Sequence, residues 1–130
     1  MGSIRKEFVV DADAAKVWAA LQDFGAVHER LAKGFVVDSE LDGDVRTVTF
    51  ANGMTAREML VDIDDGQRRL VYSVVGGRAT HYNASAQVFE ESPGRCRFVW
   101  IVDLLPNELV TPVGAMMEMG AAAMKKTLEE

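Results

Sequence analysis

The side chains that most often carry out chemistry are few and widely spaced in this sequence. The histidines are His28 and His81, and the single cysteine is Cys96. Together with scattered carboxylates, they show no spacing typical of a metal site. Nucleophile elbows, phosphate-binding loops, dinucleotide fingerprints and catalytic-triad spacings are also absent, and the glycines stand where hairpin turns are expected. The sequence therefore predicts no metal and no cofactor.

Length and composition limit the remaining possibilities. A chain of 130 residues predicts one domain, residues 1–130, and 48% hydrophobic with 26% charged residues is typical of a soluble globular protein. No apolar run is long enough to span a membrane. The net charge of −6 argues against nucleic acid and anionic membrane surfaces as partners. A single cysteine excludes an intramolecular disulfide. No apolar segment of the signal-peptide type follows Arg5 and Lys6. From these two observations we expect a cytoplasmic protein.

The first third of the chain predicts one strand followed by two short helices. Loose alternation of apolar and polar residues over 3–10 indicates a strand. Apolar residues recur at helical spacing over 13–22, where Asp13 is placed to cap the helix, and a second short helix is expected over 26–32 after Gly25 interrupts the pattern.

From Gly34 onward the apolar period changes from helical to alternating for about seventy residues. Five turn signals divide this region: Asp42-Gly43, Asn52-Gly53, Asp65-Gly66, Gly76-Gly77 and Pro93-Gly94. Six strands are therefore predicted, at about 35–41, 45–51, 55–63, 68–75, 80–91 and 95–104.

The last segment predicts a long helix with an unusual apolar stripe. Thr111 can cap it, and Pro112 suits its first turn. Helical spacing places three methionines and a glycine on one face, which favours a helix that closes over a cavity; an ordinary amphipathic helix with methionine as gap filler is the alternative. This stripe contains Met116, Met117, Gly120, Met124, Thr127 and Leu128.

These elements predict an α+β fold of the order β-αα-β6-α. Strands joined by hairpins form an antiparallel sheet, and one face of that sheet needs a cover. The C-terminal helix is the one predicted element long enough to supply it. We therefore expect a seven-stranded curved sheet wrapped around this helix, with a pocket between them.

Several local strings in this order resemble the START-like (SRPBCC) superfamily, which has the helix-grip fold. They are Asp13-Ala-Ala-Lys-Val-Trp18, Arg57-Glu58-Met59-Leu60 with Asp64-Asp65, Tyr72-Ser-Val-Val-Gly-Gly77, His81-Tyr82 and Trp100 through Pro106. The resemblance covers nearly the whole chain and extends to the polyketide cyclase/dehydrase-like and abscisic-acid-receptor-like branch. Those receptors carry a Ser-Gly-Leu-Pro gate and a His-Arg-Leu latch, whereas this chain has Asn52-Gly53-Met54-Thr55 and Arg78-Ala79-Thr80 there. These departures argue against an abscisic-acid receptor.

The resemblance implies a small-molecule pocket between the sheet and the helix. It also implies which residues of this chain match the pocket positions of the family. Those positions are Lys33, Phe50, Glu58, Tyr72, Val74, Tyr82 and Ala84. Strand alternation adds Trp100, and the helix stripe adds Met116, Met117, Gly120 and Met124. At Gly120 we expect the missing side chain to leave volume for a ligand.

Glu58 is the position where the two arguments conflict. Simple alternation would turn Met59, Val61 and Ile63 inward and leave Glu58 in solvent, paired with Arg57 or Arg46, whereas the resemblance turns Glu58 inward. We follow the resemblance. A carboxylate in an apolar pocket must be protonated or paired, so Lys33, an arginine or a tyrosine hydroxyl should lie nearby.

The sequence supports three functional hypotheses. The first is binding or carriage of a small, mainly apolar or aromatic ligand whose polar end meets Glu58, Lys33 and a tyrosine. The second is a cyclase, aromatase or dehydratase that uses Glu58 or Tyr82 as acid or base, since such proton transfer needs no signature motif. The third is a protein-partner adaptor of the same fold. Ligand identity and oligomeric state, monomer or weak dimer, stay open.

Overall fold

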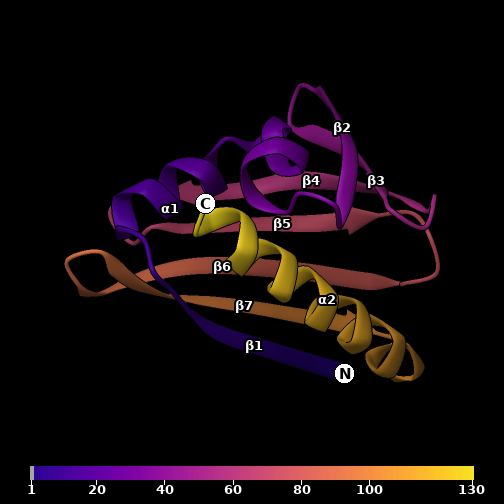
Figure 1. The fold of residues 1–130 in the computed structure, drawn as a ribbon. Helices are drawn as coiled ribbons and strands as arrows, with labels where there is room; N and C mark the ends of the chain where they lie inside the picture. Colours follow the sequence, from indigo (N-terminus) through magenta and orange to yellow (C-terminus); the bar gives the residue numbers. More distant parts are fainter. Residues whose placement is uncertain (1) are drawn as a thin grey trace.

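The computed structural model describes residues 2–130, and its elements follow the predicted order (Figure 1). The seven strands are β1 (Gly2–Val10), β2 (Val36–Asp42), β3 (Val45–Phe50), β4 (Thr55–Asp64), β5 (Arg69–Val75), β6 (His81–Ser92) and β7 (Arg95–Leu105). The helical elements are α1 (Ala14–Gln22), η1 (Phe24–Ala26), η2 (Val27–Leu31), η3 (Asn107–Leu109) and α2 (Val110–Leu128).

All seven strands form one antiparallel sheet in the order β1-β7-β6-β5-β4-β3-β2. Strands β2 to β7 are joined one after another as hairpins. The last of them, β7, pairs with β1, so β1 and β2 are the two edge strands of the sheet. Consecutive Gly76 and Gly77 both have positive φ, 78° and 76°, in the turn between β5 and β6. Only glycine adopts two such conformations in succession without steric strain, so this turn was readable from the sequence.

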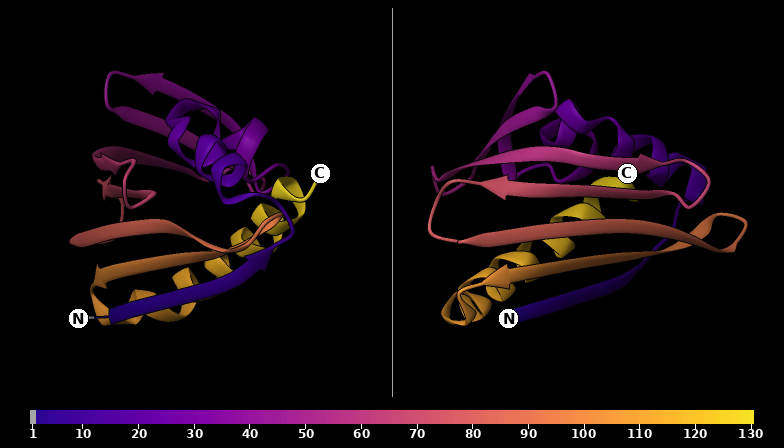
Figure 2. Two further views of the ribbon diagram at one scale, coloured as in Figure 1. Left: turned by 90° about the vertical axis from the view of Figure 1, so that its left-hand side faces the viewer. Right: turned by 180° about the vertical axis from the view of Figure 1, so that it is seen from behind.

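The C-terminal helix covers the concave face of the curved sheet, as expected, and it crosses the strands obliquely (Figures 1 and 2). Its start differs from the prediction. Residues 107–109 form a 3-10 turn, and the helix continues directly from it at Val110, so Thr111 lies inside the first turn and does not cap. The predicted inward face of the helix is confirmed, because its buried residues are Met117, Gly120, Met124, Thr127 and Leu128.

The second predicted helix is also corrected. Residues 24–26 form a 3-10 turn and residues 27–31 a single π-helical turn. This arrangement still buries Phe24, Val27 and Leu31 under the sheet, although it is not a regular α-helix.

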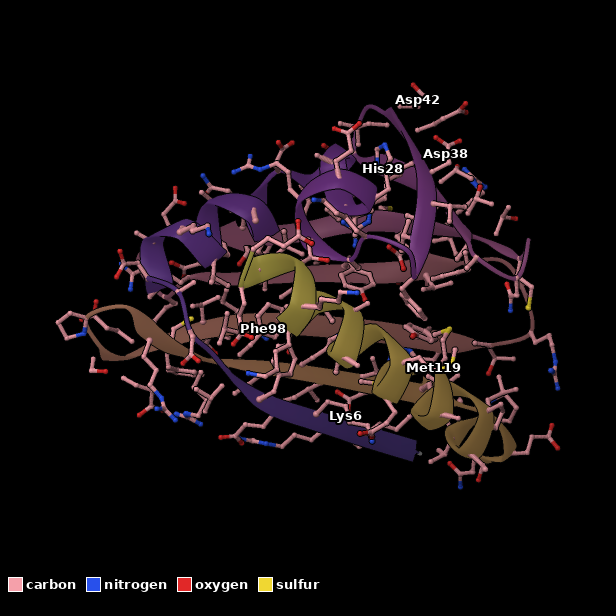
Figure 3. All side chains as sticks on the ribbon, viewed as in Figure 1. Lys6, His28, Asp38, Asp42, Phe98 and Met119 are labelled. Atoms are coloured by element: carbon pink, nitrogen blue, oxygen red, sulfur yellow. The ribbon has the colours of Figure 1, made fainter. Side chains whose placement is uncertain are left out.

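The core lies between the concave face and the helices. Phe98 and Leu104 of β7, Leu70 of β5 and Met117 of α2 are fully buried there. Figure 3 shows Phe98 on the strand behind α2, whereas Asp38 and Asp42 project from β2 into solvent. Within residues 2–130, no helix combines the length and the apolar character needed to cross a membrane.

Strand β4 alternates with the opposite phase to the one that its apolar residues suggest. Met59, Val61 and Ile63 are 40%, 54% and 38% exposed, while Glu58 is 8% exposed. Even-numbered residues from 56 to 60 are buried or half-buried and their odd-numbered neighbours are exposed, and a β-bulge shifts the register only after Leu60. Glu58 is paired across the ladder with Arg46 of β3, and cross-strand partners face the same side of a sheet.

Candidate functional site

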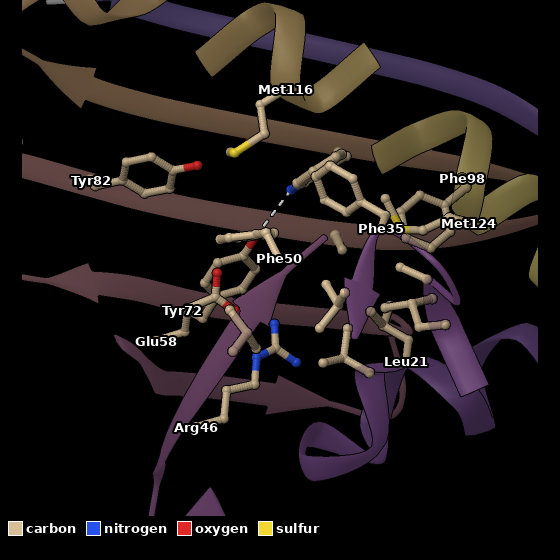
Figure 4. Close-up of a pocket in the computed structure, with 17 residues that line it drawn as sticks. Leu21, Phe35, Arg46, Phe50, Glu58, Tyr72, Tyr82, Phe98, Met116 and Met124 are labelled. Carbon is tan, nitrogen blue, oxygen red and sulfur yellow. Dashed lines mark hydrogen bonds and ion pairs between the residues drawn. The ribbon is translucent and has the colours of Figure 1, made fainter. Parts of the chain in front are cut away.

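A small pocket lies between the concave face of the sheet, the η1–η2 segment and α2, and its internal volume is about 60 Å³ (Figure 4). Most of its wall is apolar. Helix α1, the segment that leads to β2, and strands β2 and β3 contribute Leu21, Val27, Leu31, Ala32, Phe35, Val36, Val48 and Phe50. The central strands and the helix contribute Ala86, Phe98, Trp100, Met116 and Met124. Four polar residues, Arg46, Glu58, Tyr72 and Tyr82, complete it.

An ion pair forms one end of the pocket. The Nε of Arg46 donates a hydrogen bond to Oε1 of Glu58 at 2.7 Å, and the two side chains are only 5% and 10% exposed. Arg46 also donates from Nη1 to the carbonyl oxygen of Phe24 at 3.0 Å. Its guanidinium lies over the ring of Phe24 at 3.9 Å and near the ring of Tyr72 at 5.1 Å. Arg46 is therefore held by hydrogen bonds and by aromatic rings.

Two tyrosine hydroxyls lie at the same end. The hydroxyl of Tyr72 accepts a hydrogen bond from Nε1 of Trp100 at 3.3 Å, and that of Tyr82 points toward Met116 in Figure 4. Burial, followed by the nearby charge of Glu58, raises the pKa of both Tyr72 and Tyr82 well above the usual tyrosine value. Both phenols are therefore neutral hydrogen-bond donors at neutral pH.

These raised pKa values predict alkaline destabilisation. A phenol whose pKa is higher in the folded than in the unfolded state contributes stability below the unfolded value, about 10, and loses it as the pH rises through the folded value. The Tyr82→Phe variant has no such phenol, so its free energy of unfolding should fall less steeply above pH 10 than that of the wild type. Urea titrations from pH 8 to pH 11.5 measure this difference. Parallel curves would contradict the burial of an ionisable Tyr82.

The rest of the pocket wall is aromatic and rich in methionine. The rings of Phe35 and Phe50 meet edge to face with their centroids 5.3 Å apart. Phe35, Phe50 and Met116 are half-buried, whereas Phe98 and Trp100 belong to the buried core. Side chains with partial solvent access can change rotamer at lower cost than fully packed ones. Movement at the pocket is therefore easiest for Phe35, Phe50 and Met116.

The structure brings many of the sequence-predicted site residues together. The pocket wall contains Phe50, Glu58, Tyr72, Tyr82, Trp100, Met116 and Met124. It does not contain Lys33, Val74, Ala84, Met117 and Gly120. Ala84 and Met117 are fully buried in the core, and Val74, the cross-strand partner of Glu58, is half-buried near the end of β5.

The prediction for Lys33 is corrected. Its side chain is half-exposed, and its Nζ donates to Glu130 Oε1 at 2.6 Å. The backbone N–H of Lys33 donates to Oγ1 of Thr127 at 3.0 Å, which ties this loop to the end of α2. Lys33 therefore connects the loop to the C-terminal helix at the surface and does not supply a cation to the pocket.

The prediction for Gly120 is also corrected. A Cβ at this position would lie 3.1 Å from the ring of Phe35 and 3.2 Å from the indole of Trp100. Both distances are shorter than ordinary carbon contacts. Gly120 is therefore a point of close packing, where the helix backbone lies directly against two aromatic rings, and it does not leave volume for a ligand.

Arg46 lines the pocket, although the sequence suggests it only as a partner of Glu58 in solvent. The hairpin register could have identified it, because the turn at 52–53 brings residue 46 opposite residue 58. Neither histidine nor Cys96 lines the pocket, and among residues 2–130 no cluster of three or more His, Cys, Asp or Glu is placed to hold a metal ion.

The fold and the pocket together define the class of protein. A curved seven-stranded antiparallel sheet that wraps around a long C-terminal helix is the helix-grip fold of START-like proteins. The chain belongs to the polyketide cyclase / dehydrase and lipid transport family, whose model matches residues 1–130. The resemblance inferred from local strings is thereby confirmed. No functionally curated protein matches the sequence significantly.

Solved structures share this fold at low sequence identity. An uncharacterised protein from Bacillus thuringiensis is 20% identical with a TM-score of 0.88, over 99% of this chain and 100% of that one. A START superfamily protein from Mycobacterium smegmatis is 14% identical with a TM-score of 0.75, over 98% and 97% of the two chains. Norcoclaurine synthase from Thalictrum flavum, solved in complex with dopamine and hydroxybenzaldehyde, is 19% identical with a TM-score of 0.71, over 96% and 84%.

Proposed function

We propose that this protein binds a small, mainly apolar ligand in the pocket under α2. The observation that carries the proposal is the combination of a mainly apolar wall with one compact group of polar side chains. Phe35, Phe50 and the methionines offer an adaptable apolar wall, whereas Arg46, Glu58 and the tyrosine hydroxyls form a compact polar end. Binding sites for small molecules combine these two properties, because apolar area supplies affinity and a few polar groups fix orientation.

The size of the pocket limits how the ligand enters. A volume of about 60 Å³ holds a few water molecules, whereas ligand sites usually measure about 300–1,000 Å³. A ligand with an aromatic ring must therefore displace side chains, and the half-buried Phe35, Phe50 and Met116 are the ones best placed to move. We expect ligand binding to be accompanied by rotamer changes at these three residues.

A neutral apolar dye tests the pocket directly. Nile red should bind the folded protein with a stoichiometry of one, because its rings can pack against the apolar wall. The Met116→Trp variant should fill the pocket and abolish binding. Met119→Trp is the matched control, because Met119 lies on the same helix, is 63% exposed and does not line the pocket. Dye fluorescence that appears only on unfolding, or an equal loss in both variants, would contradict the proposal. Native mass spectrometry of the purified protein would identify a co-purified ligand.

An enzymatic role is the second candidate, and a specific observation favours it. The carboxylate of Glu58 and the neutral phenol of Tyr82 line the same pocket, so a base and an acid are available to one bound molecule. The complex of norcoclaurine synthase shows that this fold can hold small aromatic reactants in another protein. Once a ligand is known, Glu58→Gln decides between the roles: turnover that is lost while binding persists indicates an enzyme, and binding without turnover in the wild type indicates a carrier.

A further inference from the structure

The charges in the pocket balance within the protein itself. Among the pocket-lining residues of the described chain, 2–130, only Arg46 and Glu58 carry a formal charge, and they neutralise each other across 2.7 Å. The side chains of both are at least nine-tenths buried. The other polar side-chain groups of the wall are the phenols of Tyr72 and Tyr82 and the indole N–H of Trp100, which donates to the Tyr72 hydroxyl. The polar end is therefore rich in hydrogen-bonding groups but has no net charge.

The guanidinium of Arg46 is already occupied on several sides. Nε donates to Glu58 and Nη1 donates to the carbonyl oxygen of Phe24, while Cζ lies 3.9 Å from the ring centroid of Phe24 and 5.1 Å from that of Tyr72. An arginine that receives a ligand carboxylate usually presents two parallel N–H groups to it. Among residues 2–130, Nη2 donates to no protein acceptor, but the charge of the guanidinium is already balanced by Glu58. A ligand carboxylate on Arg46 would therefore share it with Glu58, and the two negative charges would repel each other.

Within the described residues, 2–130, no further charged side chain lines the pocket to compensate a charged ligand. Lys33, the cation expected from the sequence, is at the surface and pairs with Glu130. A ligand charge that enters an apolar site without a partner loses its hydration and recovers little in exchange. The same penalty applies to a carboxylate and to an ammonium group.

From these observations we infer that the ligand's buried end is uncharged. The pocket should accept a hydroxyl, a phenol, a ketone or an amide, and should reject a carboxylate or an amine of the same shape. The Tyr82 hydroxyl can donate to a ligand carbonyl, and Glu58 Oε2, which is not the oxygen bonded to Arg46, can accept from a ligand hydroxyl. This inference rests on the proposed ligand-binding function and specifies its chemistry.

Two matched pairs of fragments test the inference on the wild-type protein. Benzamide and benzoate have nearly the same shape, as do benzyl alcohol and benzylamine, but only the first member of each pair is neutral at pH 7. Ligand-observed NMR titrations should give the neutral members affinities about tenfold or more above their charged partners. Equal or tighter binding of benzoate or benzylamine would overturn the inference and leave the proposed function intact. Binding of no fragment at all would overturn the proposed function, and the inference with it.

Variants of the ion pair give the inverse test. Glu58→Gln leaves Arg46 without a counter-charge, so benzoate should now bind better than benzamide; Arg46→Met should likewise favour benzylamine over benzyl alcohol. Glu130→Gln is the control, since it removes an ion pair of 2.6 Å at the surface and should leave the preference unchanged. An unchanged preference for the neutral fragments in both pocket variants would overturn the inference.

If either variant fails to fold, the double variant Arg46→Gln with Glu58→Gln takes its place. Its pocket has no net charge, so it should still prefer the neutral fragments. A double variant that no longer prefers them would overturn the inference.

Discussion

Replacing Arg46 by methionine should lower the free energy of unfolding by about 3–5 kcal/mol, because it leaves the buried carboxylate of Glu58 without its partner. This loss is large beside the total stability of a single domain, about 5–15 kcal/mol. The effect follows from burial: both side chains are at least nine-tenths covered, so water cannot replace the lost ion pair. Urea denaturation monitored by tryptophan fluorescence measures the change in midpoint and slope.

The double variant Arg46→Met with Glu58→Leu supplies the control. Replacing a whole buried ion pair by apolar residues of similar size is often neutral or stabilising, so this variant should recover most of the lost stability. A double variant as unstable as Arg46→Met alone would show that the hydrogen bond to the Phe24 carbonyl, and not the ion pair, is what the fold requires. A loss below about 1 kcal/mol in the single variant, the range of exposed pairs, would contradict the burial of the pair.

Gly120→Leu should destabilise the ligand-free protein by about 1–3 kcal/mol through overpacking. The first added carbon already lies 3.1 Å from Phe35 and 3.2 Å from Trp100, and leucine adds three more carbons at a position that is already buried. The sequence alone led to the opposite expectation, in which leucine would fill a void and hold or raise stability. A lower urea midpoint than that of the wild type would support close packing at Gly120. An unchanged or higher midpoint would instead support the hypothesis of an empty volume there.

Gly114 offers a matched control on the same helix. A Cβ there would meet only Ile4 Cδ1, at 4.0 Å, which is an ordinary van der Waals contact. Gly114→Ala should therefore stabilise the protein by up to about 1 kcal/mol through helix propensity. Gly120→Ala should gain less than this or lose stability, since its Cβ must displace an aromatic ring. The same effect in both alanine variants would contradict close packing at Gly120.

Much of the fold could be predicted because its signals are local. The turn between β5 and β6 contains Gly76 and Gly77, and their positive φ angles are conformations that few other residues adopt. The apolar stripe of α2 was visible because helical spacing brings residues three and four apart onto one face. The number of strands, their hairpin order and the inward face of the last helix follow from such local rules.

The pocket could be predicted only in part, because its assembly depends on long-range register. Alternation in β4 favoured Met59, Val61 and Ile63 as inward residues, whereas the register with β3 turns Glu58 inward beside Arg46 and leaves those three apolar side chains partly exposed. The resemblance to START-like proteins turned Glu58 inward, as the structure has it, and the cost of burying a carboxylate left Lys33, an arginine or a tyrosine hydroxyl as its possible partner. The actual partner, Arg46, lies twelve residues away in sequence on the neighbouring strand.

The seven strands and the long covering helix follow from the sequence alone, since turn residues and apolar periodicity are properties of short segments, and the resemblance of local strings indicated the superfamily. The cation that neutralises Glu58, the aromatic rings against Gly120 and the small volume of the pocket are visible only in the folded chain. These features depend on where the curved sheet places β3, β7 and α2 relative to one another. A shift of one residue in strand register turns a side chain from the pocket to solvent.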